Sequence, residues 1–442
     1  MVSEAGQEGA YTVLVIGDGD LSDEVATALE SAGADVERLG QPDEEEVREA
    51  LEDRSVDSVA VVARDDAVVL RMALIVRSIS EEAPLVLTIF DETMAEQVAG
   101  ELPNTHVTSL ADIVAPSLAG PCIDERATAL SVVGDEPVLL IENGDELEEG
   151  SVPQLKAHRL EALARALFTP YDKSAGLLLY GAIGLVAVFM LETITAMPVL
   201  DNSFVDAFYG SAKTLVTVDP NLDVDDGPGW YKVFTSMTML IALVFAACFT
   251  AGLVNRVVER RLTGLVGGRA VPRRDHVVVV GLGEVGLRLC LLLRGCGVPV
   301  VAVERDKEGS QIGVAHELGL PIVIGRGSDP SLMRRLSLHR ARAVAAVTGN
   351  DLENISTSMT ARGIDEDIGV VLRVGDGDVA NETRSLLALG VIRDVHRIAA
   401  VLIASVAIGD DEPEGVVCLG DDAHLRFPDG RLEQAKLQTL AG

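Results

Sequence analysis

Basic residues are scarce in this chain of 442 residues. It has 36 lysines and arginines against 69 aspartates and glutamates, which gives a net charge of -33 at neutral pH. A protein that binds nucleic acid needs a basic surface to neutralise phosphates. The charge balance therefore excludes nucleic acid as a partner and indicates a well-hydrated acidic surface on the soluble parts of the chain.

Side chains that build reactive sites are also few. The seven histidines form no constellation, and no Ser/His/Asp or Cys/His arrangement is visible. The five cysteines lack metal-type spacing, and we interpret them as reduced, buried residues in a cytosolic context. We therefore expect neither a metal site nor an enzyme. The cysteines are Cys122, Cys248, Cys290, Cys296 and Cys418.

Two long apolar runs lie in the middle of the chain. Residues Val233 to Val254 include no charged side chain, and a helix of this length reaches the roughly 30 Å of a bilayer's hydrocarbon at about 1.5 Å per residue. The uncharged run Ala175 to Leu191 is shorter, but Ser174 and the residues Glu192 to Thr195 extend it toward the interfaces. We therefore predict two membrane-spanning helices in contact with lipid.

The charges around these runs predict their orientation. Lysine and arginine precede the first run and follow the second, whereas the loop between them is mostly acidic. Basic loops stay on the cytoplasmic side of a membrane. We expect a multi-pass protein of the cell membrane with both termini in the cytoplasm and the loop outside.

On each side of the apolar runs, short Val/Ile/Leu segments alternate with helix-length segments. In the first block these segments include Val13 to Ile16, Val59 to Ala63 and Leu85 to Phe90, and a similar alternation runs from Asp275 to about Asp394. This pattern is typical of β-α-β units that build a doubly wound parallel sheet. We interpret the acidic stretch from Glu142 to Gly150 as a linker.

The two soluble blocks are a repeat. An offset of 264 residues places Gly17 on Gly281 and Gly33 on Gly297, and from Val61 onward the offset is 285. The first copy therefore lacks 21 residues between its second and fourth strands. In the second copy this interval contains a strand and a polar turn at 321–329, so we expect one strand and its turn to be missing from the first copy.

The second copy has a nucleotide-binding fingerprint at its first strand-to-helix turn. Gly281, Gly283 and Gly286 allow the backbone to approach a pyrophosphate at a helix N-terminus, and Glu304 ends the next strand, where an acidic residue binds ribose hydroxyls. In the first copy, Ser22 and Gly40 stand where Gly286 and Glu304 stand in the second. We predict NAD or an adenine nucleotide at the second copy alone; the alternative is that its glycines only permit close helix-sheet packing.

The motifs of residues 275–394 resemble the N-terminal lobe of RCK domains, the regulators of potassium conductance. Besides the fingerprint they include Gly325-Arg-Gly-Ser-Asp-Pro330, Ala343 to Thr348 with Asp351 to Asn354, and Val371 to Arg373. The resemblance implies that Gly281, Gly283, Glu284, Glu304, Gly325 and Ser328 surround the nucleotide. We include their neighbours Val285, Gly286 and Arg305 in the predicted site. We expect the C-terminal lobe of that family to be absent or much shortened in this chain.

The loop between the two spans resembles that of two-helix potassium channels, which assemble as tetramers. Apolar residues from Phe204 to Leu215 recur at helical spacing, and Thr214, Thr217 and Val218 match the family's filter entry. The family continues with Gly-Tyr-Gly-Asp, whose glycines let carbonyl groups point at the ion. This chain instead has Asp219, Pro220 and Asn221, which do not adopt glycine conformations. Two outcomes stay open: a cation-attracting ring of four Asp219 carboxylates, or a closed pore that serves only as a scaffold.

Together these features predict Rossmann-like α/β domains of the RCK type flanking an all-α pore module. We divide the chain into a degenerate domain with its linker (1–150), a two-helix transmembrane module with a re-entrant loop (151–272), a nucleotide-binding domain (273–410) and a short tail (411–442). The predicted function is a tetrameric, nucleotide-gated channel for a monovalent, potassium-like cation. The alternatives are a non-conducting regulatory subunit and a membrane-anchored NAD-dependent oxidoreductase.

Overall fold

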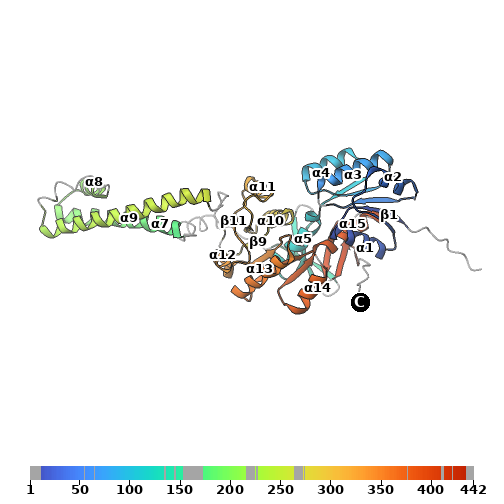
Figure 1. Cartoon of the computed structure of the whole chain (residues 1–442). Coiled ribbons are helices and arrows are strands. Elements are labelled where there is room, and N and C mark those ends of the chain that lie inside the picture. Colours follow the sequence, from blue (N-terminus) through green and yellow to red (C-terminus); the bar gives the residue numbers. More distant parts are fainter. Residues whose placement is uncertain are drawn as a thin grey trace, which may run out of the picture. The chain divides into compact units, whose positions relative to one another are not determined.

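The computed structural model falls into two compact units, which we describe separately (Figure 1). One unit joins Met1–Leu155 to Val266–Gly442, and the other is Lys156–Leu265. The structure describes residues 11–53, 55–63, 65–133, 136–143, 146–152, 173–215, 224, 227–262, 272, 274–375, 377–409, 413–420 and 422–434.

The first half of the soluble unit contains a parallel sheet in the order β2-β1-β3-β4-β5. Its strands alternate between two helix layers: Val13 and Val15 face the core shared with the second half, whereas Leu14 and Ile16 pack under α2, α3 and α4. The elements are β1 (Thr12–Ile16), α1 (Asp20–Ser31), β2 (Asp35–Leu39), α2 (Glu44–Asp53), β3 (Ser58–Val61), α3 (Asp66–Ile79), β4 (Leu85–Thr88), α4 (Glu92–Glu101), β5 (Thr105–Thr108) and α5 (Leu110–Ile123).

The second half contains a parallel sheet in the order β11-β10-β9-β12-β13-β14. Its elements are β9 (Val277–Val280), α10 (Glu284–Gly295), β10 (Val300–Glu304), α11 (Ile312–Glu317), β11 (Ile322–Ile324), α12 (Pro330–Arg335), η2 (Leu338–Arg340), β12 (Ala343–Ala346), α13 (Asp351–Ile364), β13 (Gly369–Val374), α14 (Gly377–Leu386), β14 (Val391–Asp394) and α15 (Val395–Ile408).

The two sheets confirm the predicted repeat and its gap. The amide of Gly17 donates to the carbonyl of Leu39 at 2.8 Å, and in the second half that of Gly281 donates to Val303 at 2.9 Å. Both Gly33 and Gly297 have positive φ. Strand β11 pairs with the outer edge of β10, and in the described residues of the first half nothing pairs with the corresponding edge of β2.

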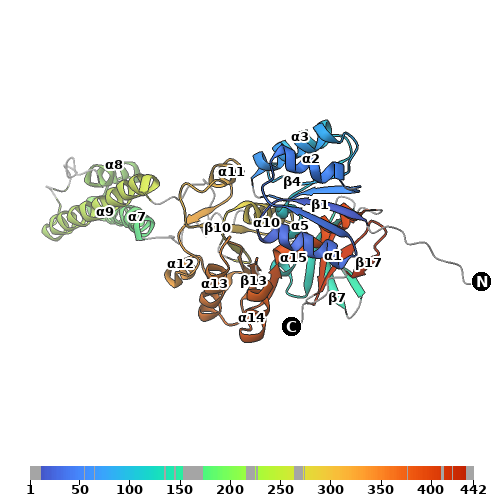
Figure 2. The same cartoon turned by 45° about the vertical axis from the view of Figure 1, so that its right-hand side comes forward.

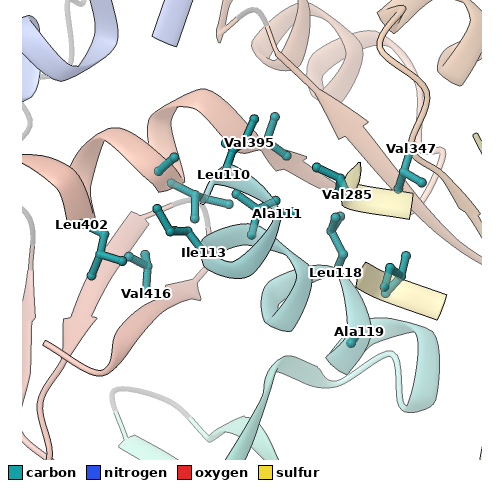
Figure 3. Packing of buried hydrophobic residues seen from close by; sticks show 14 of the residues in the cluster. Leu110, Ala111, Ile113, Leu118, Ala119, Val285, Val347, Val395, Leu402 and Val416 are labelled. Atoms are coloured by element: carbon teal, nitrogen blue, oxygen red, sulfur yellow. The ribbon is translucent and has the colours of Figure 1, made fainter. Parts of the chain in front are cut away.

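Each half ends in a helix that covers the other half. Helix α5 packs against α10 and the strands β12 and β13, and α15 packs against α1 and the strands β3 and β4. Both views place α15 beside α1, and Figure 3 shows side chains of α5 between Val285 of α10 and Val395 of α15 (Figures 1, 2 and 3). Because α5 and α15 are buried on nearly all sides, each needs both halves to leave water.

Hydrogen bonds at the C-terminal ends of α5 and α15 also connect the two halves. The hydroxyl of Ser58, before α3, donates to the carbonyl of Ala407 near the end of α15 at 2.5 Å. Reciprocally, the guanidinium of Arg342 donates to the carbonyl of Ile123 at the end of α5 at 2.9 Å. The carbonyls that end each helix therefore find partners in the opposite half.

A small antiparallel sheet follows each of the two exchanged helices. Residues 142–143 and 146–150, expected as part of a linker, instead lie in the first sheet. Leu139 and Leu140 of this sheet are buried, whereas the acidic side chains of Glu142, Glu148 and Glu149 are exposed. Residues 411–442, expected as a short tail, include the second sheet. The strands are β6 (Ala127–Val133), β7 (Glu136–Asn143), β8 (Glu146–Ser151), β15 (Gly415–Leu419), β16 (Asp422–Arg426) and β17 (Leu432–Gln434).

The other unit consists of α7 (Lys173–Leu200), α8 (Phe204–Leu215) and α9 (Gly229–Leu262). Two segments, Leu177–Leu200 and Gly229–Val254, are long and apolar enough to cross a membrane, with mean hydropathies of 2.1 and 2.3. Only 22% and 17% of their apolar windows are buried, unlike the core helices of a soluble domain.

Glycines set the contact between α7 and α9. A Cβ added to Gly181 would lie 2.7 Å from the amide nitrogen of Phe249, and one added to Gly252 would lie 2.6 Å from that of Leu178. The backbones of the two helices therefore approach at distances that exclude larger residues. This arrangement favours a packing role for Gly252 over that of a hinge.

We expect Gly286→Ala to destabilise the soluble unit by about 2 kcal/mol, because the added Cβ would overlap the carbonyl oxygen of Gly281. Gly295, in the same helix, has open space around an added Cβ, so Gly295→Ala serves as the control and should be neutral or slightly stabilising. Thermal unfolding of the full chain measures both. Equal melting temperatures for the two variants would contradict the packing role of Gly286.

Candidate functional site

A cavity of about 490 Å³ opens at the carboxyl ends of the strands in the second sheet. It lies at the end of β9, which pairs with β10 on one side and with β12 on the other. The strand order reverses at this point, which is where doubly wound sheets bind ligands. Six of the nine residues predicted for the nucleotide line it: Gly281, Gly283, Glu284, Glu304, Arg305 and Gly325.

The other three predicted residues lie behind or beside the cavity. Val285 and Gly286 are buried in the first turn of α10. Ser328 lies next to α13, where its carbonyl accepts a hydrogen bond from the Thr360 hydroxyl at 3.4 Å. These three therefore support the walls of the cavity and do not line it.

The three glycines of the fingerprint play different parts. Gly281 has a φ of 101°, and an added Cβ would lie 2.7 Å from the amide nitrogen of Thr348; at Gly286 it would meet the carbonyl oxygen of Gly281. Close packing alone accounts for these two residues. Gly283 has a negative φ and nothing within 4 Å of an added Cβ, so neither packing nor backbone strain accounts for it. It leaves the N-terminus of α10 open to the cavity.

Glu304 ends β10 and holds the glycine turn in place. One carboxylate oxygen accepts a hydrogen bond from the amide of Leu282 at 2.8 Å, and the other accepts one from the amide of Asp306 at 2.9 Å. A carboxylate has lone pairs for about four hydrogen bonds, so two amide partners leave capacity for ribose hydroxyls. Beside it, the exposed Arg305 forms an ion pair with Glu353 at 3.4 Å.

Asn354 fixes the opposite wall of the cavity. Its side chain is fully buried, and its Oδ1 accepts hydrogen bonds from the amide and the hydroxyl of Thr348, both at 2.8 Å. Its Nδ2 donates to the carbonyls of Thr348 at 2.9 Å and Arg373 at 3.0 Å. One amide group therefore ties the turn after β12 to the end of β13.

Several residues of this wall were not predicted from the sequence. Thr348, Asn350, Glu353 and Arg373 all line the cavity, yet none was assigned to the site. Most of them lie in the quoted motifs that follow β12 and end β13. The available signal was the position of these motifs directly after predicted strands, which places them at the same edge of a parallel sheet.

Charges of both signs face the cavity. Burial raises the pKa of the Glu284 carboxyl, the nearby carboxylate of Asp66 raises it further, and Arg373 opposes both effects. Since Asp66 belongs to the first half of the unit, the first half contributes to the electrostatics of this cavity. The guanidinium of Arg373 and the N-terminus of α10 are the groups that suit a pyrophosphate.

The first half has kept some residues that shape this site and lost others. Asp66 accepts hydrogen bonds from the amides of Phe90 and Asp91 at 2.9 Å, as its counterpart Asp351 does from Gly375 at 3.1 Å. By contrast, Val69 stands where Asn354 stands in the second half. The hydroxyl of Ser22 donates to the carbonyl of Gly17 at 3.1 Å. In the second half, Gly286 packs against the corresponding carbonyl of Gly281 without a side chain.

In the helical unit, a buried carboxylate joins all three helices. Glu192 of α7 has an exposed fraction of 3% and is hydrogen-bonded to the hydroxyls of Thr214 in α8 and Thr238 in α9. The Lys213 amine lies over the ring of Tyr209, 4.8 Å from its centroid. The half-length helix α8 is thus held against the two long ones.

Of the six residues predicted for the pore, Thr214 is the one that the structure describes. It is buried, and besides its contact with Glu192 its hydroxyl donates to the carbonyl of Gly210 at 3.1 Å. The other five predicted pore residues, Thr217, Val218, Asp219, Pro220 and Asn221, lie outside the described residues. Within the described ranges, no group of three or more His, Cys, Asp or Glu side chains could hold a metal ion.

Comparisons with known proteins agree with this architecture. The TrkA-N domain family matches residues 277–394. Potassium channel protein 1 of Methanocaldococcus jannaschii is 20% identical over 263 residues, which cover 56% of this chain and 76% of the relative. The voltage-gated potassium channel Kch of Escherichia coli is 23% identical over 214 residues, which cover 48% of this chain and 51% of the relative.

Among solved structures, the RCK domain of GsuK has the same fold. The two share 13% sequence identity with a TM-score of 0.51, and the match covers 91% of this chain and 78% of that one. The predicted resemblance to RCK-domain potassium channels is therefore confirmed. The chain is similar to potassium channel proteins, its residues 277–394 match the TrkA-N domain family, and its fold is that of the RCK domain of GsuK.

Proposed function

We propose that the chain is a subunit of a ligand-regulated channel for a monovalent, potassium-like cation. One observation carries this proposal: a single chain combines a span, a half-length helix and a second span with a soluble unit that contains an open cavity at a glycine turn. Half-spanning backbone is stable within a membrane only where it is buried in protein or lines an aqueous path.

The cavity suits NAD or an adenine nucleotide. A pyrophosphate would lie over Gly283, where the N-terminus of α10 and the Arg373 guanidinium supply the favourable charge. The ribose hydroxyls would reach Glu304. An acidic residue at this position favours the free 2'-hydroxyl of NAD over the 2'-phosphate of NADP.

The proposed subunit has both termini in the cytoplasm and assembles as a tetramer around the pore. It comprises a nucleotide-free domain at 1–150, a pore module at 151–272, a nucleotide-binding domain at 273–410 and a short C-terminal segment at 411–442. Helix α9 runs without a break from the apolar span to Leu262, so displacement of its cytoplasmic end would reach the span. Regulation requires the nucleotide to bind the open and closed arrangements with different affinity.

Large apolar side chains on the second half supply a surface for assembly. Leu352 at the start of α13 has an exposed fraction of 75%, Leu386 at the end of α14 one of 77%, and Met359 of α13 one of 52%. Exposed apolar groups of this size are typical of protein interfaces. We assign α13 and α14 to contacts between copies of this chain.

Two other functions are alternatives to a conducting channel. A non-conducting regulatory subunit would share the cavity and the spans but carry no current. A membrane-anchored NAD-dependent oxidoreductase would need a proton donor and a substrate pocket next to the nucleotide. The known relatives reported above are channels, which favours conduction over both.

We expect Glu304→Gln to raise the dissociation constant for NAD by about tenfold to a hundredfold, because hydrogen bonds to a charged group contribute about 1.5–3 kcal/mol. Gly283→Ala should weaken NAD binding by a similar factor without loss of stability, since its Cβ meets only the open cavity. Isothermal titration of the purified full chain gives both values. Glu317→Gln, an exposed carboxylate of α11, is the control. Unchanged NAD affinity in the Gly283→Ala variant would mean that the glycines serve packing alone.

We expect liposomes that contain only this protein to pass potassium, and NAD to change the rate at least severalfold. Asp219→Asn should lower the flux if four carboxylates attract the ion at the pore entrance. The Glu304→Gln variant is the control for regulation: its flux without NAD should equal that of the unmodified protein. Absence of flux under every nucleotide condition would leave the regulatory subunit as the better assignment.

We expect the double substitution Leu352→Asp with Leu386→Asp to shift the protein from tetramer toward smaller species, because each change places a charge in an apolar interface. Light scattering after size-exclusion chromatography measures the mass. The control is Leu74→Asp with Val68→Asp, which alters exposed apolar residues of α3 in the first half. A tetramer that withstands the first pair but not the second would place the interface on the first half.

A further inference from the structure

A second cavity, of about 630 Å³, lies between the two halves of the soluble unit and far along the sheet from β10. Its walls come from the edge strand β14 and from α14 of the second half, from the start of β6 in the first half, and from the end of β15. Its residues belong to neither the nucleotide fingerprint nor the RCK motifs of the sequence.

Arg393 of β14 lines this cavity and is almost completely buried, with an exposed fraction of 7%. Its Nε donates to the carbonyl of Ser117 and its Nη2 to that of Thr128, both at 3.3 Å. A guanidinium has five N–H donors, and no carboxylate of the described residues forms an ion pair with this one. A buried charge without a counter-charge is costly, so an anion in the cavity would stabilise it.

Two further guanidinium groups line the same cavity. Arg384 of α14 donates to the side-chain oxygen of Asn381 and to the carbonyl of Ile392, both at 3.3 Å. Arg126, just before β6, forms a two-point contact with Asp124 at 2.9 and 3.1 Å. These contacts hold the two side chains at the cavity and reduce the entropy lost when they bind a ligand.

The acidic residues around the cavity do not pair with Arg393. Glu125 and Glu142 also line it, and the carboxylate of Glu142 accepts a hydrogen bond from the amide of Gly420 at 3.2 Å. The carboxylate of Asp124 is paired with Arg126, so within the described residues none of these carboxylates forms an ion pair with Arg393. The buried guanidinium of Arg393 therefore attracts an anion into the cavity.

We propose that this cavity is a second regulatory site and that it binds a small organic anion with a phosphate or carboxylate group. Arg393 and Arg384 bind the oxyanion through their paired N–H groups, the geometry in which guanidinium recognises both kinds of anion. Because the walls come from both halves, the bound anion links β14 to the start of β6. The site is separate from the nucleotide cavity and does not depend on nucleotide binding.

The test is isothermal titration of the full-length protein in 150 mM salt with saturating NAD. Pyrophosphate and inorganic phosphate represent phosphate ligands, and malonate and citrate represent carboxylate ligands. We expect at least one anion to bind with one site per chain. Arg384→Gln should raise its dissociation constant at least tenfold. Arg393→Lys, which keeps the charge but loses the paired donors, should do the same.

The matched control is Arg48→Gln, which removes an exposed arginine of α2 and changes the net charge of the chain equally. This variant should bind the anion within twofold of the unmodified protein. NAD titrations of the same samples show whether each variant is folded. They also distinguish loss of anion binding in this cavity from loss of NAD binding in the nucleotide cavity. The proposal is overturned if none of the four anions binds, if Arg48→Gln weakens binding as much as Arg384→Gln, or if NAD displaces the anion.

Discussion

The exchange of α5 and α15 between the two halves is the constraint on which the soluble unit depends. Each helix is apolar on nearly all sides, and each covers the sheet of the half to which it does not belong. Burial of a large aliphatic side chain contributes about 1.5–3 kcal/mol. Neither sheet can therefore keep its core closed without the other half, and the two halves must fold as one body. The reciprocal hydrogen bonds of Ser58 and Arg342 fix the ends of the exchanged helices.

This exchange explains why the first half persists without the residues of a nucleotide site. Asp66 still ties two strand ends together, and Gly17 and Gly33 still shape the turns around α1. Other positions have changed: Gly40 stands at the place of the cavity-lining Glu304, and Val69 at that of Asn354, which fixes the cavity wall. A half that serves as a structural partner needs only the residues that hold its own backbone, so loss of the ligand-facing ones leaves the fold intact.

The features of this structure that could be predicted from the sequence depend on residue types at particular positions or within one segment. The repeat was visible because Gly17 and Gly281 occupy backbone positions that strongly favour glycine, and the two long apolar helices were visible because length and apolarity can be read from the sequence. The helix exchange was not, since a helix that is apolar all round specifies burial but not its partner. Strands β7 and β8 were mistaken for a linker because their acidic surface residues hide the buried Leu139 and Leu140.

Within the candidate site the same distinction holds. Gly283 and Glu304 belong to a motif with fixed spacing and could be named in advance. Arg373 and Asn354 could not, because their place at the cavity depends on the order of β9, β12 and β13 in the sheet, which joins residues from distant parts of the chain. The sequence could suggest that the motifs share an edge of a sheet, but it could not indicate which side chains turn toward the ligand.

The paired strands β13 and β14, at one edge of the second sheet, connect the two cavities. Strands β13 and β14 pair in a register that sets Arg373, of the nucleotide cavity, beside Arg393, of the cavity between the halves. Asp394 follows at once and caps α15 by accepting a hydrogen bond from the amide of Arg397 at 3.1 Å. A ligand that displaces β14 must therefore also displace the start of the helix that covers the first half. Such a displacement changes the nucleotide's affinity only if the nucleotide binds the two arrangements of these strands with different affinity. The first half lacks a nucleotide site of its own, but it supplies the surface on which α15 packs and against which a displaced α15 would move.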